Sequence, residues 1–90
     1  MWQTHQEAAA AALESIGLRS RAAIVRAKST QSDAISELEH TFFGLTDICE
    51  WDRNLGPEGV SAMNHQRVVD VMGAINDAIA AINTEARRAA

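Results

Sequence analysis

Hydrophobic residues recur along this chain at steps of three and four, the spacing that places them on one side of an α-helix. The longest series lies in the C-terminal third of the chain and consists of Val68, Met72, Ile75, Ile79, Ile82 and Ala86. This heptad pattern is typical of helices that pack along a seam against a partner helix, as in a coiled coil. We therefore expect a helix over residues 58–88.

A second series predicts a helix near the N-terminus, over residues 5–28. Its predicted core line is Ala9, Leu13, Ile16, Ser20, Ala23 and Ala27. Thr4 and Glu7 have the spacing of a capping box, in which each side chain accepts a hydrogen bond from a free backbone N–H group. Glycine in a helix interior costs about 1 kcal/mol relative to alanine. Gly17 therefore either ends a first short helix or is kept inside a longer one because it permits the close approach of another helix. We expect one continuous helix.

A third series predicts a helix over residues 32–53, in the middle of the chain. Its apolar line is Ile35, Leu38, Phe42, Leu45 and Cys49. Thr30 followed by Asp33 is a plausible capping box at its start. The glycines and the proline of residues 54–59 end it, since proline lacks the N–H group that a helix interior needs. The resulting turn is short, so the second and third predicted helices should pack antiparallel.

Two of the predicted helices carry a further, narrower apolar line, and a helix with two apolar sides usually has two neighbours. Together with Phe43, which lies off both lines, these positions are the predicted interface with a partner or a second subunit: Leu18, Val25, Ile48, Trp51 and Leu55. In the alternative, Trp51 packs within its own subunit against Leu18 and Val25. Tryptophan is enriched at binding hot spots, but the pattern alone does not separate the two interpretations.

These patterns predict an all-α fold with a single domain over residues 1–90. Its three amphipathic helices would form an antiparallel bundle or a helical hairpin. Hydrophobic residues make up 47% of the chain, but many are alanines, and only two tryptophans and two phenylalanines are aromatic. Because alanine buries little apolar surface, the core of one subunit would be thin. We therefore expect a homodimer, the usual way in which a small helical chain enlarges its core.

The net charge and the cysteine content limit the partners and the cellular compartment that we expect for the protein. The formal net charge is −4, which repels phosphate backbones unless the basic residues gather on one face. The single cysteine excludes an internal disulfide and suits a reducing compartment. No segment approaches the roughly 18 apolar residues of a membrane span. We expect a cytoplasmic protein with no membrane partner.

Basic residues gather in one short segment, residues 18–28, which contains no acidic residue. Arg19, Arg21 and Arg26 could bind nucleic acid or an acidic partner there. However, the predicted helix 32–53 is rich in acidic residues, and charges that flank an apolar seam commonly steer which helices pair. We favour this charge-steering role, within or between subunits, over nucleic-acid binding.

Two combinations of residues could suggest chemistry. Glu37 and His40 have the spacing of half a di-iron carboxylate motif, but they point away from the Phe42 line, whereas such ligands project into a helical core. We expect a solvated surface pair. Cys49 lies at a core position, where cysteine behaves as a small inert hydrophobic residue. The sequence therefore predicts no catalytic, metal or cofactor-binding residues, and we expect a protein that is not an enzyme.

Because the sequence predicts no catalytic or metal-binding residues, our functional hypothesis depends on the apolar helical faces that exceed what one subunit can bury. It favours a small regulatory protein–protein interaction module, such as an inhibitor, antiactivator, adaptor or chaperone-like protein. The alternative is a nucleic-acid-associated regulator that uses the arginines of the first helix. A metal-binding helical bundle comes third.

Overall fold

The computed structural model describes the backbone of residues 1–55 and 62–89 and the side chains of residues 1–47 and 66–88. This part of the chain is helical, as predicted, but it contains four helices and not three. They are α1 (Trp2–Ser15), α2 (Arg19–Arg26), α3 (Gln31–Leu55) and α4 (Ala62–Ala89). The expected helices 32–53 and 58–88 correspond to α3 and α4, whereas the expected helix 5–28 is divided into α1 and α2.

The prediction of one continuous N-terminal helix is wrong because the chain turns at Gly17, whose φ of 85° lies in the left-handed region. Two hydrogen bonds close the end of α1: Gly17 N–H donates to the Glu14 carbonyl over 2.9 Å, and Leu18 N–H donates to the Leu13 carbonyl over 3.0 Å. This pair of bonds defines a Schellman motif, which favours glycine at the left-handed position. A local signal for a helix end thus outweighed the helical periodicity on either side of it.

The two predicted capping boxes differ in outcome. Helix α1 begins at Trp2 with Met1 at its N-cap and no side-chain cap, so Thr4 lies inside the helix and the box with Glu7 is wrong. At the start of α3, by contrast, Asp33 N–H donates to the Thr30 hydroxyl over 3.1 Å. Thr30 therefore satisfies one of the free N–H groups that every helix start presents.

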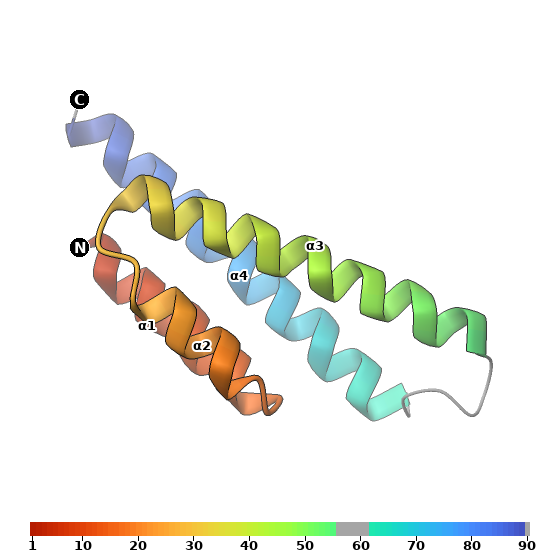
Figure 1. Cartoon of the computed structure of the whole chain (residues 1–90). Coiled ribbons are helices and arrows are strands. Elements are labelled where there is room, and N and C mark those ends of the chain that lie inside the picture. Colours follow the sequence, from red (N-terminus) through yellow and green to blue (C-terminus); the bar gives the residue numbers. More distant parts are fainter. Residues whose placement is uncertain (56–61, 90) are drawn as a thin grey trace.

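The helices run alternately in opposite directions, and both ends of the chain lie at the same end of the molecule (Figure 1). Each helix contacts the next one in sequence, and α4 also contacts α1 over much of the length of α1. Helices α1 and α2, about 21 and 12 Å long, are too short to cover α3 and α4, which extend about 37 and 42 Å. The N-terminal pair therefore covers only the end of the α3–α4 hairpin that holds the termini (Figure 1).

This arrangement makes the molecule elongated. Its extents are 48 × 21 × 17 Å and its radius of gyration is 13.8 Å, compared with about 12 Å for a compact domain of this length. The core lies where all four helices meet. Its largest fully buried side chains are Leu13, Val25, Leu38, Ile75 and Ile82.

The predicted core lines hold on α3 and α4 and shift on α2. Leu38 and Leu45 of the α3 line are buried, as are Ile75 and Ile82 of the α4 line, and the other described members of both lines are half-buried. Val71 and Ala78, beside the predicted line on α4, are also buried. The side chain of Cys49, predicted to lie in the core, is outside the described part of the chain. After Gly17, however, the turn rotates the helix, so that Ala22 and Val25 face the core. The predicted core residues Ala23 and Ala27 are exposed.

Candidate interaction surface

The structure separates the six residues predicted to form an interface. Leu18 is half-buried, and Phe43 has 64% of its surface exposed. Val25 is different, because its side chain has no exposed surface (0%) with which to meet a second subunit. The other three residues, Ile48, Trp51 and Leu55, have side chains outside the described part of the chain.

Leu18 and Phe43 border one groove, of about 300 Å³, where the start of α2 meets the middle of α3. The remaining residues of its lining come from both helices: Arg21, His40, Thr41, Gly44, Leu45 and Asp47. An ideal Cβ atom added at Gly44 would meet nothing within 4 Å. The α2–α3 groove therefore combines apolar, acidic and basic groups on an open surface.

Phe43 is the most exposed large hydrophobic residue of this surface, and its ring contacts that of the preceding residue, Phe42. Its ring meets that of Phe42 edge to face, with ring centroids 6.1 Å apart and an angle of 82° between the planes. Phe42 itself packs against the core. Such a pair is worth about 0.5–1.5 kcal/mol beyond the area that it buries. Phe43 thus has one aromatic contact that favours this orientation, although most of its surface is exposed to solvent.

An ion pair joins α2 to α3 beside the groove. Arg21 Nη1 donates a hydrogen bond to Glu37 Oε1, and the Glu37 side chain is only 17% exposed. The prediction that Glu37 and His40 form a solvated pair is therefore wrong for Glu37, which faces α2, while His40 is exposed. One turn further along α3, the hydroxyl of the buried Thr41 donates to the Glu37 carbonyl over 2.8 Å.

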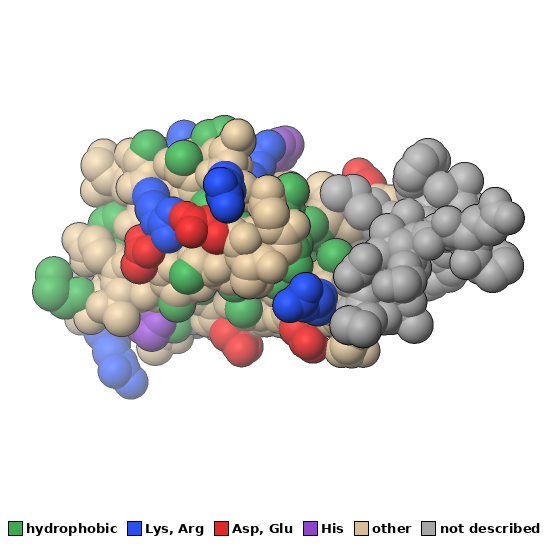
Figure 2. Space-filling view, turned by 90° about the horizontal axis from the view of Figure 1, so that it is seen from below, with side chains coloured by type: hydrophobic (Ala, Val, Ile, Leu, Met, Phe, Trp, Pro, Cys, Tyr) green, Lys and Arg blue, Asp and Glu red, His purple; other side chains and the backbone are tan. Residues whose placement is uncertain are grey.

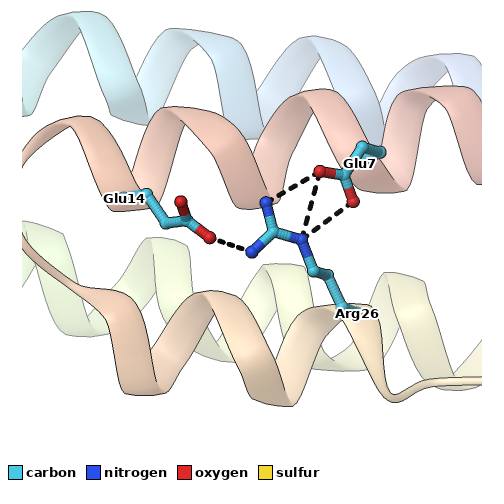
Figure 3. Close-up of polar contacts among 3 residues, drawn as sticks. All are labelled: Glu7, Glu14 and Arg26. Carbon is cyan, nitrogen blue, oxygen red and sulfur yellow. Dashed lines mark hydrogen bonds and ion pairs between the residues drawn. The ribbon is translucent and has the colours of Figure 1, made fainter.

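A second charged cluster joins α2 to α1 (Figure 3). Arg26 Nε and Nη2 donate to the Glu7 carboxylate over 2.7–3.1 Å, and Arg26 Nη1 donates to Glu14. The hydrogen bond from Arg26 lowers the pKa of the Glu7 carboxyl and raises the pKa of the Arg26 guanidinium. One arginine thus holds two glutamates that lie two turns apart on α1.

The three arginines that were predicted to steer helix pairing therefore have different environments. Arg21 pairs with α3, as a charge-steering residue would, whereas Arg26 pairs with α1. Arg19 is exposed and makes no ion pair with a described residue. On the face shown in Figure 2, side chains of both charge signs lie next to one another, and hydrophobic side chains are scattered among them.

Gln6 is a buried polar residue that the sequence analysis missed. It is 6% exposed, and its side-chain amide donates to the carbonyl of Val25 over 2.7 Å and to that of Lys28 over 2.8 Å. It thereby connects α1 to the C-terminal end of α2. The sequence did contain a signal for this burial: Gln6 lies three residues before Ala9 and seven before Leu13, which places it on the same side of the helix as these core residues.

The described side chains include no group of three or more histidine, cysteine, aspartate or glutamate residues that could hold a metal ion. Within the described residues, no helix has the length and hydropathy needed to span a membrane.

We compared the chain with protein-family models, with curated proteins and with solved structures, and none of the three comparisons found a match.

Proposed function

We propose that this chain is a small, non-catalytic protein–protein interaction module with a regulatory role, as an inhibitor, antiactivator, adaptor or chaperone-like protein. It acts through the exposed helical surface around the α2–α3 groove. In this proposal the module associates with another protein and also with a second copy of itself.

The observation that carries the proposal is the exposed ring of Phe43 beside the groove. Binding energy in protein interfaces concentrates in a few large side chains, aromatic ones above all, that enter pockets on the partner. Phe43 projects from α3, and its contact with the ring of Phe42 favours one orientation, which reduces the conformational entropy lost when it binds. Leu18 adds apolar surface on the opposite wall of the groove.

The pairing of the arginines supports this choice over the nucleic-acid alternative. A nucleic-acid surface needs basic side chains that are free to neutralise phosphates. Arg21 and Arg26 are already bound to carboxylates, which leaves Arg19 as the arginine of α2 that has no ion pair with a described residue. The metal-binding alternative has less support, because Glu37 of the candidate motif is bound to Arg21.

Affinity capture of the tagged chain from its native cells tests the proposal. We expect specific proteins to be retained by the native chain and lost with Phe43→Ser. The control is Val69→Ser, which also replaces an exposed hydrophobic residue with serine but lies on α4, away from the groove. Retention of the same proteins by all three forms would remove the α2–α3 groove from the proposal.

A gel-shift series at low salt tests whether the protein binds nucleic acid, as the alternative function requires. If the protein bound nucleic acid through α2, Arg19→Ala would weaken that binding and reduce its salt dependence. We expect no binding by the native chain even at low salt. A shifted complex that Arg19→Ala abolishes would instead favour the alternative.

A further inference from the structure

The apolar lines of α3 and α4 are buried unequally in one copy of the chain. Leu38 and Ile75 have no exposed surface. Other members of the same two lines pack against the core but are only half-buried: Ile35, Phe42, Met72 and Ile79. Helices α1 and α2 lie together on one side of the α3–α4 hairpin (Figure 1), so no described helix covers the other side.

The side of α3 that faces away from α2 follows from helical geometry, in which successive residues are about 100° apart around the axis. Glu37 faces α2, because it binds Arg21. Glu39 and Thr46 lie about 160° and 180° around α3 from Glu37. Phe43 lies about 120° from Glu37, so it borders both the α2–α3 groove and the side opposite to α2.

The corresponding side of α4 faces away from α1. Arg67 and Glu85 each line a surface groove with residues of α1. Val69 lies about 160° around α4 from Arg67, and Asn76 lies about 180° from Glu85. We call the side of the hairpin that faces away from α1 and α2 the outer hairpin face. It carries Glu39, Phe43 and Thr46 on α3 and Val69, Gly73 and Asn76 on α4.

The half-buried apolar residues lie on the same side. Phe42 is about 140° around α3 from Glu37, and Met72 is about 140° around α4 from Arg67. Ile35 and Ile79, each seven residues from one of them, continue the same two lines. Together they form an apolar strip between α3 and α4 on the outer hairpin face.

The outer hairpin face carries little charge where α4 forms it. Residues 71–84 contain one charged residue, Asp77, which lies about 100° around the helix from Asn76, toward α1. Phe43 and Val69, by contrast, are 64% and 41% exposed. The exposed side of a surface helix is normally polar and charged. This face is therefore better suited to contact with other helices than to contact with water.

Phe43 lies at the same level along the hairpin as the middle of this part of α4. Leu18 lines one groove with Phe43, and Ser15 lines another with Val71. Ser15 and Leu18 flank the turn between α1 and α2. Phe43 and Val71 therefore lie within about one helical turn of each other along the bundle.

Gly73 makes a hollow in the outer hairpin face at this level. It is exposed, and a Cβ atom added to it would meet nothing within 4 Å. Val69 and Asn76 lie about one turn before and after it, and Met72 lies beside it. Four residues with this spacing form the kind of hole that a side chain of a facing helix enters in knobs-into-holes packing.

A two-fold axis parallel to the helices and above the outer hairpin face brings each knob to a hole. Rotation about such an axis keeps the level of every residue and places α3 of each copy over α4 of the other, again antiparallel. The ring of Phe43 then meets the hollow at Gly73 of the other copy, and the contact occurs twice, as a two-fold interface requires. The two apolar strips meet at the centre of the resulting four-helix bundle.

The size of the outer hairpin face also suits a dimer. Helix α3 is about 37 Å long, and two adjacent helices are together about 20 Å wide. The face therefore has an area of about 700 Å², close to the roughly 800 Å² that each partner contributes to a standard stable interface.

We propose that the outer hairpin face binds a second copy of this chain, with Phe43 of each copy entering the hollow at Gly73 of the other. The proposal rests on the proposed function for the association with a second copy, and it adds the face and the pairing. The occupant is a second copy because this chain presents a knob and a hole at one level of the same face. Since the dimer covers Phe43, another protein can bind this residue only after the dimer separates.

Sedimentation equilibrium of the native chain and Val69→Glu tests the face. The introduced carboxylate would be buried beside the ring of Phe43, so we expect the dissociation constant of the dimer to rise about tenfold or more. Ile24→Glu is the matched control, because Ile24 is also 41% exposed but lies on α2, and it should leave the dissociation constant nearly unchanged. Phe43→Ala, which removes the knob, should raise it about thirtyfold.

Gly73→Leu separates association from folding. Leucine is a better helix former than glycine, and in one copy the space beside Gly73 is open. Urea unfolding at concentrations where the chain is monomeric should therefore show no loss of stability. In the dimer the introduced leucine occupies the hollow that Phe43 needs, so we expect the dissociation constant to rise about tenfold or more.

The double variant with Phe43→Ala and Gly73→Leu tests the pairing itself. In its dimer the introduced leucine of one copy fills the space that the missing ring of the other copy leaves. We expect the double variant to dimerise more tightly than either single variant. Because a Cβ atom at Gly73 would meet nothing within 4 Å in one copy, this recovery cannot arise from a contact within one chain.

Three outcomes would overturn the proposal: a native chain that stays monomeric up to about 1 mM, a Val69→Glu variant that dimerises as well as Ile24→Glu, or a double variant that dimerises no better than the single ones. Circular dichroism of each variant checks the helix content, and Val69→Ser with Ile24→Ser replaces the glutamate pair if either unfolds. A monomeric chain that still captures other proteins through Phe43 would contradict this inference alone. A dimer that captures nothing would contradict only the regulatory function.

Discussion

The side-chain amide of Gln6 on α1 donates a 2.7 Å hydrogen bond to the Val25 carbonyl near the end of α2. The last carbonyl groups of a helix have no partner within the helix. Gln6 adds a second donor to the Val25 carbonyl, which also accepts a hydrogen bond from Lys28 N–H over 3.3 Å, and it binds the carbonyl of Lys28, two residues beyond the end of α2. Helix α2 has eight residues, well below the length at which an isolated helix is stable in water. Its existence therefore depends on contacts such as this one.

We expect Gln6→Leu, which keeps the approximate volume but removes the donor, to lower the free energy of unfolding by about 1–3 kcal/mol. Urea unfolding followed by circular dichroism measures the change. Gln3→Leu is the matched control, because Gln3 lies on the same helix but is exposed. Gln6→Glu should be worse than Gln6→Leu, since it brings a negative charge to the negative end of α2. Equal stability of the Gln6→Leu and Gln3→Leu variants would contradict this assignment.

The two glycines Gly17 and Gly73 should respond to alanine in opposite directions. Gly17 has a φ of 85°, which alanine adopts only with strain, so Gly17→Ala should lower the free energy of unfolding by about 1–2 kcal/mol. Gly73 lies inside α4, and a Cβ atom there would meet nothing within 4 Å. Gly73→Ala should therefore raise stability by about 0.5–1 kcal/mol. Thermal or urea unfolding measures both changes. A Gly17→Ala variant at least as stable as the native chain would argue against the turn at Gly17, and a destabilised Gly73→Ala variant would contradict the prediction for Gly73.

The pairing of Glu7 with Arg26 should make stability depend on pH in the acid range. Because folding lowers the pKa of Glu7 below its ordinary value of 4.5, the contribution of the pair is fully present above pH 4.5. It is lost as the pH falls through the lowered pKa of the folded protein. The effect should be small, since solvent surrounds the pair.

To isolate this contribution, urea midpoints of the native chain and of Glu7→Gln would be compared from neutral pH to well below 4.5. We expect the native chain to be more stable above this value and the two curves to converge below it. Glu39→Gln makes the same chemical change at a carboxylate that has no ion pair with a described residue. A gap between the native and Glu7→Gln curves that stayed constant at every pH would contradict the prediction.

The ion pair between Arg21 and Glu37 should hold α2 on α3 more strongly than an exposed pair would, because Glu37 is mostly buried. A double-mutant cycle with Arg21→Met and Glu37→Gln isolates the pair from the other effects of each substitution. We expect a coupling energy of about 1 kcal/mol, at the upper end for surface pairs. The same cycle on Arg19 and Glu37 is the control and should give a value near zero. A coupling no larger than in the control would mean that packing alone positions α2.

On α3 and α4 the periodicity of the sequence was a sufficient guide. The predicted limits of 32–53 lie close to the observed Gln31–Leu55, and Leu38, Leu45, Ile75 and Ile82 are buried as expected. Each of these helices has a main apolar line that runs along its length, and burying this line fixes which side of the helix faces inward, so local pattern and tertiary packing agree there. For the candidate surface, the sequence singled out Phe43 because it lies off both apolar lines, and the structure places it on the surface beside Leu18.

The N-terminal third is where the pattern alone failed. Steps of three and four continue through Gly17, and the periodicity of a continuous helix put Val25 on a secondary line and Ala23 in the core. The left-handed turn at Gly17 resets the rotation of the chain, so Val25 is buried and Ala23 exposed. Likewise, the capping-box spacing of Thr4 and Glu7 could not reveal that Arg26, nineteen residues away in the chain, binds Glu7.

The sequence by itself therefore determined that this protein is helical and which sides of α3 and α4 face inward, because both depend on the regular spacing of apolar residues within one helix. Only the tertiary structure decided that the first helical segment folds back on itself. It also decided which arginine meets which glutamate, and that Leu18 and Phe43 border one groove. These features depend on contacts between segments, whose geometry follows from the turn at Gly17 and not from the spacing of residues along any one helix.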